Sequence, residues 1–494
     1  MYTEQSVPEE INIVILYEPQ SIEVPTISEH LKSFGVFSSA TVSYLPATQG
    51  LSCKVDLNIF DVIIIHYSVR LSVNEGNYML SQCYQDAVKS FKGYKILFIQ
   101  DEYEGTEIAR KWITTLGINT VYTCVPKEYI EKVYPKARFP NVEFLSTLTG
   151  YVPLSLKDLN SYKRTSERSI MIGYRGRVLP YWYGSLGQEK KNIGKYIKEY
   201  CLVNGYKVDI EWDDSKRIYS GWYDFLGECK ATLGTESGSN LFDFDGSVRR
   251  RIEEKLAQNP SLTYEELYEV CIAPYETIKM NQISPKIFES IALKTALILF
   301  EGNYSGVLKP YIHYLPLKKD FSNIEEIFCR LRNDQFIQGL VDQAYKDTIE
   351  SGKYSYKQFI KEIDDYIYSK LKKHSADRKI IYSYSGYITN NEFCLNSFSQ
   401  SGILLPSSKI LSMTQISNTL EPSFKRKTIR SFLNDTCIKT EFLQNLTFWE
   451  LGKVFIFKAI NLLIDSVKKI LPSQLKLSIK KLLLILLNKK PECL

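Results

Sequence analysis

Apolar runs of strand length alternate with longer amphipathic segments along the first part of the chain. The runs occupy residues 11–18, 61–68, 94–103 and 119–125, and a shorter one lies near 142–146. They are continuously apolar, as is typical of parallel strands covered on both faces. Segments of helical length separate them, at residues 24–34, 76–92, 106–116 and 127–134. The pattern predicts a parallel α/β domain at residues 1–150, followed by a linker at 151–168.

A second α/β pattern occupies residues 169–373. Its strand-like runs lie at residues 169–177, 206–212, 230–237, 295–302 and 313–320. Helical segments at 188–205 and 220–229, a polar helical insertion at 247–271 and three helices that end near Lys373 complete it. Each half is predicted to be a Rossmann-like unit, yet neither carries the GxGxxG fingerprint that a dinucleotide cofactor needs. A dehydrogenase is therefore disfavoured.

Length and cysteine content restrict the class of protein. The chain of 494 residues is too long for one hydrophobic core and suits two domains with an appendage. No two of its ten cysteines lie closer than 28 residues apart, so it has no CxxC pair for zinc or redox exchange. The polar, acidic start MYTEQSVPEE does not resemble a secretion signal. These features indicate a cytoplasmic protein.

Positive charge is concentrated at the end of the chain. Residues 440–494 hold nine lysines against four acidic residues, a net charge of +5, so the rest of the chain carries only +1. A nearly neutral body argues against a nucleic-acid partner, because binding to phosphates needs a basic surface. Residues 374–438 are rich in Ser, Thr and Asn and are predicted to be a polar linker.

The last segment, residues 439–494, has apolar residues at helical spacing with lysines between them. Its longest uncharged stretch is far shorter than the roughly 20 residues that a membrane span requires. One interpretation is an amphipathic pair of helices that binds an anionic membrane surface. The other is a helical hairpin docked on protein. The high Leu, Ile and Lys content favours the membrane.

The stretch SPKIFESIALKTALILFEG, residues 284–302, carries the main functional signal. Glu289 is predicted to open a short apolar helix that leads into a buried strand. This stretch resembles the donor-sugar helix of GT-B glycosyltransferases, in which two Rossmann-like domains face each other across a cleft. The resemblance covers about residues 11–373 and implies that Glu289 contacts the ribose of a nucleotide-sugar. Many retaining members have a second glutamate eight residues earlier, where this chain has Asn281.

The resemblance also implies a site for the donor diphosphate after the first strand of the second domain. The sequences IGYRGR and LGQEKK place Arg175, Arg177 and Lys190 there. A glycine turn lets backbone amides approach a phosphate, and fixed cations neutralise its charge. The alternative is that these are solvated charges near a turn.

The turn GTESGSN follows another predicted strand and offers a substitute for the missing glutamate. Glu236 is the candidate, and small or polar neighbours leave room for a sugar or phosphate: Gly234, Ser237, Gly238, Ser239 and Asn240. The alternative is an ordinary turn in which Glu236 caps a helix. Asp243 and Asp245 form a DxD triplet that could bind a divalent cation. Such triplets arise often by chance, so no metal and no cofactor besides the donor is expected.

Groups at the ends of the first-domain strands are candidates for acceptor activation. His66 ends one strand, and Asp101 and Glu102 end another. A base at such a position could remove the proton of an acceptor hydroxyl. The alternative for His66 is a hydrogen-bonded core histidine.

Together these features predict a metal-independent glycosyltransferase of the hexosyltransferase type. It would move a sugar from a nucleoside diphosphate to a glycan or lipid-linked glycan during surface-polysaccharide synthesis, at the inner face of the cell membrane. The alternative is a non-catalytic two-domain module that binds a nucleotide or glycan and is recruited by its tail.

Overall fold

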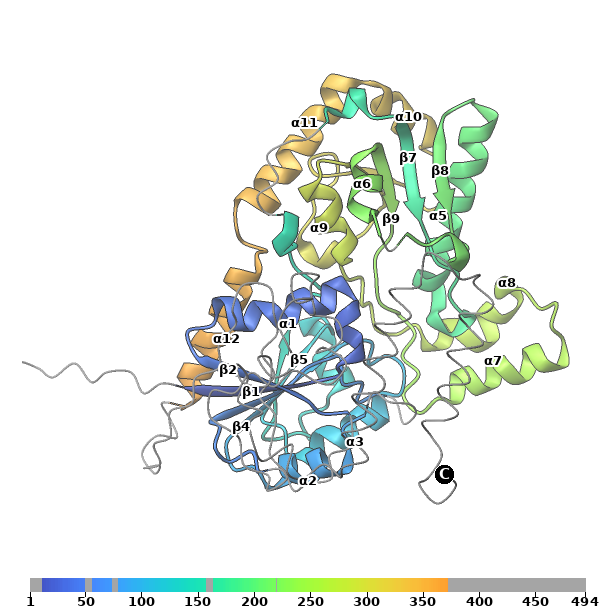
Figure 1. The fold of residues 1–494 in the computed structure, drawn as a ribbon. Coiled ribbons are helices and arrows are strands. Elements are labelled where there is room, and N and C mark those ends of the chain that lie inside the picture. Colours follow the sequence, from blue (N-terminus) through green and yellow to red (C-terminus); the bar gives the residue numbers. More distant parts are fainter. Residues whose placement is uncertain (1–10, 49–55, 73–78, 157–162, 219, 372–494) are drawn as a thin grey trace, which may run out of the picture. The chain divides into compact units, whose positions relative to one another are not determined.

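Two parallel sheets organise the computed structural model, which describes residues 11–48, 56–72, 79–156, 163–218 and 220–371. All of these residues belong to one compact unit. The predicted polar linker at 374–438 and the basic tail at 439–494 lie outside the described residues. The predicted α/β class with two parallel sheets is confirmed (Figure 1).

The first sheet has six strands in the order β2-β1-β3-β4-β5-β6. They are β1 (Asn12–Tyr17), β2 (Thr41–Pro46), β3 (Val62–Ile65), β4 (Tyr94–Ile99), β5 (Thr120–Thr123) and β6 (Glu143–Ser146). The accompanying helices are α1 (Pro25–Phe37), α2 (Gln82–Ser90), α3 (Thr106–Leu116) and α4 (Ile130–Val133). Strand β2 was not predicted, because Thr41 and Ser43 interrupt its apolar pattern. The other strands lie within or almost within the predicted ranges.

The second sheet has five strands in the order β11-β10-β9-β7-β8. They are β7 (Ile170–Arg175), β8 (Val208–Glu211), β9 (Cys229–Gly234), β10 (Ala296–Phe300) and β11 (Leu315–Leu317). The helices that follow in the chain are α5 (Gly184–Val203), α6 (Trp222–Gly227), α7 (Ser247–Gln258), α8 (Tyr264–Leu267), α9 (Pro285–Ala292), α10 (Ile324–Arg332), α11 (Asp334–Tyr345) and α12 (Tyr356–Leu371). The predicted insertion at 247–271 contains α7, α8 and a π-helical turn at Tyr268–Ile272.

Each sheet has a point at which the strand order reverses. In the first sheet β1 pairs with both β2 and β3, and in the second β7 pairs with both β8 and β9. The connections that leave the carboxyl ends of such strands diverge to opposite sides, which opens a crevice there. The topology therefore places a ligand site beside the ends of β7 and β9.

The last described helix returns to the first sheet. Ile360, Ile363 and Ile367 of α12 are buried in the same apolar cluster as Ile13 of β1 and Phe98 of β4. Figure 1 shows α12 beside α1, and the two helices are in contact. The predicted range 169–373 assigned this helix to the second domain. Periodicity identifies a helix but not the sheet that its apolar face will cover.

Two further passages of chain connect the second half to the first core. We call residues 240–244 and 277–282 the crossing segments. Phe242, Ile278 and Met280 lie in the apolar cluster of the first sheet. The Asp243 amide also donates a 2.9 Å hydrogen bond to the carbonyl of Tyr103. The loop that follows β9 is thus fixed to the first half by both packing and backbone hydrogen bonds.

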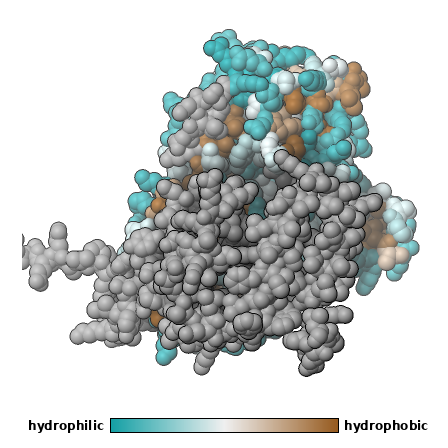
Figure 2. All heavy atoms as spheres, viewed as in Figure 1, coloured by the Kyte–Doolittle hydropathy of each residue, from teal (hydrophilic) through white to brown (hydrophobic). Residues whose placement is uncertain are grey.

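Hydrophilic residues cover much of the described surface that is visible in Figure 2, with apolar residues in small groups between them. Scattered apolar residues of this kind are normal on a protein surface. No helix within the described ranges has the length and apolar character needed to cross a membrane.

Candidate functional site

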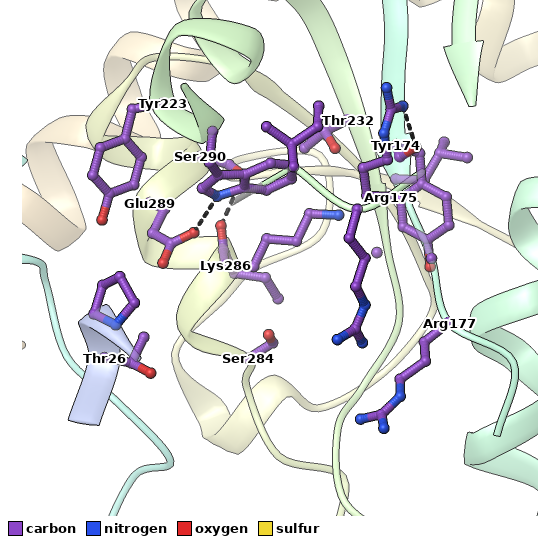
Figure 3. Close-up of a pocket in the computed structure, with 18 of the residues that line it drawn as sticks. Thr26, Tyr174, Arg175, Arg177, Tyr223, Thr232, Ser284, Lys286, Glu289 and Ser290 are labelled. Carbon is purple, nitrogen blue, oxygen red and sulfur yellow. Dashed lines mark hydrogen bonds between the residues drawn. The ribbon is translucent and has the colours of Figure 1, made fainter. Parts of the chain in front are cut away.

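A cavity of about 670 Å³ opens beside the carboxyl ends of β7 and β9. Residues from both halves of the chain line it: Val24, Pro25, Thr26 and Glu29 at the start of α1, Ser155, and the ends of β7 and β9 with parts of α5, α6 and α9. Figure 3 shows cationic side chains on one side of it and Glu289 with Tyr223 on the other. The cavity therefore lies where the strand order predicts a ligand.

The three predicted diphosphate ligands all line this cavity, but they differ in availability. Arg175 holds the Asp209 carboxylate with both guanidinium nitrogens, at 2.8 and 2.9 Å. Arg177 is exposed and has no hydrogen-bond or ion-pair partner among the described residues. Burial lowers the pKa of Lys190, an effect that the negative charge of Asp101 partly offsets. Arg177 is therefore freer than Arg175 to bind an anion.

Lys286 is a fourth cation in the cavity, and the sequence analysis did not identify it. Its Nζ atom is buried and has no hydrogen-bond partner within the described part of the chain. The ammonium lies 4.3 Å from the ring centre of Tyr174 and 5.4 Å from that of Trp222. Burial lowers the pKa of Lys286 to about 7, and Glu289 opposes the shift. A desolvated ammonium without a partner is costly unless a ligand supplies the missing acceptor.

Glu289 lines the cavity but does not open its helix, which corrects the prediction. Helix α9 begins at Pro285, and Glu289 is its fifth residue. Ser284 and Pro285 form the start signal, since proline is favoured in the first helical turn. The Glu289 carboxylate accepts a 2.8 Å hydrogen bond from Trp222 Nε1 (Figure 3). Burial raises the pKa of Glu289, and the neighbouring Glu29 charge adds to the effect.

The turn after β9 divides into two parts. Gly234 and Ser237 line the cavity, as the sequence analysis expected. Glu236 is 3% exposed and points elsewhere, accepting hydrogen bonds from the amides of Asn303 (2.6 Å) and Tyr304 (2.9 Å). In this geometry the carboxylate fixes the loop after β10, so the capping alternative describes Glu236 better than a role in the cavity.

The next three residues of this turn also lie outside the cavity lining. Ser239 is fully buried, and its hydroxyl donates to backbone carbonyls, including that of Tyr183 at 3.0 Å. Asn240 accepts a 2.9 Å hydrogen bond from the Met280 amide. Gly238 has a φ of +93°, and a Cβ there would lie 2.8 Å from Met280. Gly238, Ser239 and Asn240 therefore hold the crossing segments in place.

His66 is buried in the first core, away from the cavity lining. The Ser68 amide donates to its Nδ1 at 3.1 Å, so Nδ1 is an acceptor and Nε2 carries the proton. Nε2 then donates to His30 Nδ1 at 3.0 Å. Burial lowers the pKa of both rings, that of His30 to about 3. The structure matches the core-histidine alternative rather than a base that faces an acceptor.

Asp101 and Glu102 are adjacent in sequence but face different surroundings. Glu102 is fully buried, and burial raises its pKa to about 7. Thr123 and Tyr134 donate hydrogen bonds to one of its carboxylate oxygens. Asp101 is exposed, adopts a left-handed φ of +60° and accepts a 2.8 Å hydrogen bond from the Tyr103 hydroxyl. Asp101 alone of the first-half candidates is exposed to solvent.

The DxD carboxylates hold the first turn of α7. Asp243 accepts hydrogen bonds from the amides of Val248 (3.1 Å) and Arg249 (2.9 Å), and Asp245 accepts one from Ser247 (3.0 Å). Within the described ranges, no group of three or more His, Cys, Asp or Glu residues could hold a metal ion. Both aspartates thus satisfy helix amides that would otherwise be unpaired.

The sequence analysis did not identify several of the residues that line the cavity. Lys286 follows the Ser284-Pro285 start signal and precedes Glu289 by three residues, which places both on one face of α9. That spacing could have identified it. Glu29 and Thr232 carry no comparable local signal, because only the packing of the two halves brings Glu29 to the end of β9.

No protein-family model matches the chain, and no curated protein matches its sequence. Solved structures are similar to it in fold. An alpha-glucosyltransferase in complex with UDP-glucose and DNA containing an abasic site is 13% identical, with a TM-score of 0.41, over 73% of this chain and 99% of that one. The DNA-modifying enzyme beta-glucosyltransferase is 12% identical, with a TM-score of 0.41, over 72% and 99%. Anabaena HepE in complex with UDP-glucose is 10% identical, with a TM-score of 0.40, over 74% and 100%.

Proposed function

We propose that this protein is a glycosyltransferase that takes a sugar from a nucleoside diphosphate donor. The observation that carries the proposal is the buried Lys286 ammonium, which lacks a hydrogen-bond partner among the described residues of the cavity. Its position beside the ends of β7 and β9 is where parallel sheets bind phosphate-bearing ligands. The missing partner is, in this proposal, a phosphate oxygen of the donor.

The rest of the cavity supports a donor of this kind. Its volume of about 670 Å³ lies within the usual range for small-molecule and cofactor sites. Arg177 and Lys190 stand near Lys286 and could share the two charges of a diphosphate. Gly234 and Ser237 leave the end of β9 open to the transferred sugar. We propose that Arg175 contributes indirectly, since Asp209 already occupies its guanidinium.

On the acceptor side we propose Asp101 as the base. Its carboxylate is exposed at the end of β4, and the Tyr103 hydroxyl fixes one oxygen. The left-handed backbone of a non-glycine residue is a strained arrangement of a kind that is common at functional sites. A carboxylate held in this way could accept the proton of an acceptor hydroxyl as the sugar is transferred.

We further propose a glycan or lipid-linked glycan as the acceptor, with surface-polysaccharide synthesis as the setting. The support is the alternation of apolar and lysine residues at 439–494, which suits an anionic membrane surface inside the cell. The proposed transfer is of the hexosyltransferase type and independent of metal. The capping roles of Asp243 and Asp245 support the metal independence. Sedimentation with anionic vesicles and turnover in EDTA would test these two points.

The decisive experiment measures binding and turnover together. A panel of UDP-, GDP- and ADP-sugars is screened for a rise in melting temperature, because a ligand that binds only the native state stabilises it. We expect at least one donor to raise it and to release free nucleoside diphosphate slowly. The absence of both effects for the whole panel would refute the proposal.

A second candidate function is a non-catalytic nucleotide- or glycan-binding module. One observation favours it: His66, Glu102 and Glu236 are all buried in internal hydrogen bonds, which leaves few groups for acid-base chemistry. Donor binding without any release of nucleoside diphosphate, with glycan, lipid-linked glycan and DNA acceptors all present in turn, would establish the module instead.

A further inference from the structure

A second cavity, of about 620 Å³, has no described lining residue in common with the cavity beside β7 and β9. Two segments of chain form it: residues 306–313, between β10 and β11, and residues 346–354, between α11 and α12. The first segment contributes Lys309 and His313, and the second contributes Lys346 and Lys353. Cations therefore gather around this cavity, and the proposed transfer reaction gives it no role.

His313 gives the second cavity a fixed wall. Its side chain is 4% exposed, and both ring nitrogens have partners. Nδ1 accepts a 3.2 Å hydrogen bond from the Lys309 amide, so Nε2 carries the proton and donates to Asp347 at 3.0 Å. Gln343 donates to the same carboxylate oxygen at 2.8 Å. These contacts satisfy Asp347 within the protein and join the two segments that form the cavity.

The three lysines of the second cavity have no such partners. Within the described ranges, the ammonium groups of Lys309, Lys346 and Lys353 form no hydrogen bond or ion pair. Lys353 lies over the ring of Tyr354, 5.2 Å from its centre. Cations that line one cavity raise its positive potential and attract an anion. Glu350 is the remaining acid of the lining, and its carboxylate also has no partner in the described part of the chain.

Uncommon backbone geometry supports both walls of the second cavity. Lys346–Glu350 is a π-helical turn, closed by a 3.2 Å hydrogen bond from the Ser351 amide to the Lys346 carbonyl. Such turns occur frequently at functional sites. In the other wall Tyr311 has a left-handed φ of +59°, and Ser305, just before that segment, has one of +56°. Strained backbone of this kind clusters at ligand sites.

The chemistry of this lining indicates the class of ligand. Lysine ammonium groups are common binding partners of phosphate oxygens. A carboxylate such as that of Glu350 repels a phosphate but accepts hydrogen bonds from hydroxyl groups. Val307 and the Tyr354 ring add apolar surface for a carbon skeleton. The volume lies within the usual range for small-molecule sites. A small phosphorylated compound with hydroxyl groups would use all of these features.

We propose that this cavity is a second binding site, for a small phosphate ester that carries hydroxyl groups. Lys309, Lys346 and Lys353 bind the phosphate oxygens, and Glu350 accepts a hydrogen bond from a hydroxyl group. The ligand bridges the loop before β11 and the connection into α12, which are already joined by His313. The inference goes beyond the proposed function and does not depend on it, because the two cavities share no described lining residue.

The test measures binding of glycerol 3-phosphate and ribose 5-phosphate to the full-length protein by calorimetry. Inorganic phosphate, which lacks the hydroxyl-bearing carbon skeleton, is the reference ligand. We expect at least one ester to bind more tightly than inorganic phosphate, with an affinity that falls as salt is added. The double variant Lys309→Met with Lys346→Met should weaken its binding about tenfold or more, because two hydrogen bonds to a charged group are lost.

Matched variants separate this cavity from the other cations of the protein. Lys357→Met with Lys361→Met removes the same charge from exposed positions of α12 outside the lining, and it should leave the affinity unchanged. Lys309→Arg with Lys346→Arg keeps both charges and should retain binding. Failure of both esters to bind more tightly than inorganic phosphate, or equal losses in the two methionine pairs, would overturn the proposal. Binding that Lys286→Met abolishes but Lys309→Met with Lys346→Met spares would place the ester in the other cavity and would also overturn it.

Discussion

Lys286 is the residue whose chemistry most constrains the cavity. Its ammonium is buried between the rings of Tyr174 and Trp222, and burial lowers its pKa to about 7. In the empty protein the charged form is therefore disfavoured, while a phosphate would favour it. Binding of an anionic donor and protonation of Lys286 should be coupled.

We predict that donor binding weakens as the pH rises from 6 to 9. Over this range the Lys286 side chain of the protein without a donor loses its proton, so donor binding must restore that proton. Calorimetry in buffers of different ionisation enthalpy should therefore detect proton uptake on binding above pH 7. A UDP-sugar is a suitable probe, because both of its phosphates stay ionised throughout.

Lys286→Met should weaken donor binding by tenfold or more at pH 6, the size of a lost charged hydrogen bond, and should flatten the pH dependence. Lys195→Met, on an exposed position of α5 outside the cavity lining, should change neither property. A pH dependence that persists in Lys286→Met would assign it to another group.

Glu102 provides a test of buried charge in the first core. Its folded pKa of about 7 exceeds the ordinary value of 4.5, so the folded protein retains the proton while the unfolded chain ionises. Stability attributable to this group is present below pH 4.5 and is lost as the pH rises to 7.

We predict that Glu102→Gln gains stability relative to the wild type as the pH rises from 4.5 to 7. The gain should approach about 3 kcal/mol and then level off. Chemical denaturation at each pH measures it. The buried His30 and His66 contribute a separate loss of stability as the pH falls below 6.5, but they are common to both proteins and cancel in the difference. A difference that does not change with pH would show that folding does not raise the pKa of Glu102.

The sequence analysis identified some of the residues that line the cavity, and there are physical reasons why it did not identify the others. Arg177, Lys190 and Glu289, which the sequence analysis took from the resemblance to glycosyltransferases, all line the cavity. The sequence could not predict whether the side chains of His66 and Glu102 point into the core or toward solvent, because successive side chains of a strand alternate between opposite faces. A shift of one residue at the strand end exchanges an exposed group for a buried one.

Among the elements, α7 depends on the aspartates that precede it. Asp243 accepts from two amides of its first turn, and it is 5% exposed. We predict that Asp243→Ala lowers the free energy of unfolding by about 1 kcal/mol, the usual cost of a lost helix cap. Thermal or denaturant unfolding would measure the loss.

Asp245→Ala is the matched control, because Asp245 accepts from a single amide at an exposed position. Its cost should be a few tenths of a kcal/mol, since water can replace it. Equal losses for the two variants would contradict the capping role. A loss of activity in Asp243→Ala that manganese restores would support the metal interpretation.

Local sequence signals predicted where helices and strands lie better than they predicted which of these elements pack together. Helix α3 occupies the predicted residues 106–116 because Gly105 and Gly117, both left-handed, bound it. Strand β2 was not predicted, because its stability comes from pairing with β1 rather than from an apolar sequence.

For the molecule as a whole, α12 joins the end of the described chain to its beginning. Ile363 is 1% exposed and packs in the first-sheet core. We predict that Ile363→Ala lowers the free energy of unfolding by about 2 to 5 kcal/mol, as large-to-small core substitutions do. Denaturant unfolding would measure it.

Lys361→Ala, two residues earlier on the exposed face of α12, is the control and should leave the free energy of unfolding almost unchanged, because its ion pair with Asp365 is exposed to solvent. If Ile363→Ala were equally mild, α12 would not be an integral part of the first core. No sequence pattern could have assigned this helix, because its partners lie more than 200 residues away in the chain.

The crossing segments have a consequence for protein engineering. Phe242, Ile278 and Met280 are encoded within the second half but pack in the first core. A chimera that exchanged residues 169–373 as a block for those of another protein would remove these three side chains, together with α12, and leave holes in the recipient. Borders that let residues 240–244, 277–282 and 356–371 stay with the first half would preserve its interior while the cavity beside the ends of β7 and β9 is replaced.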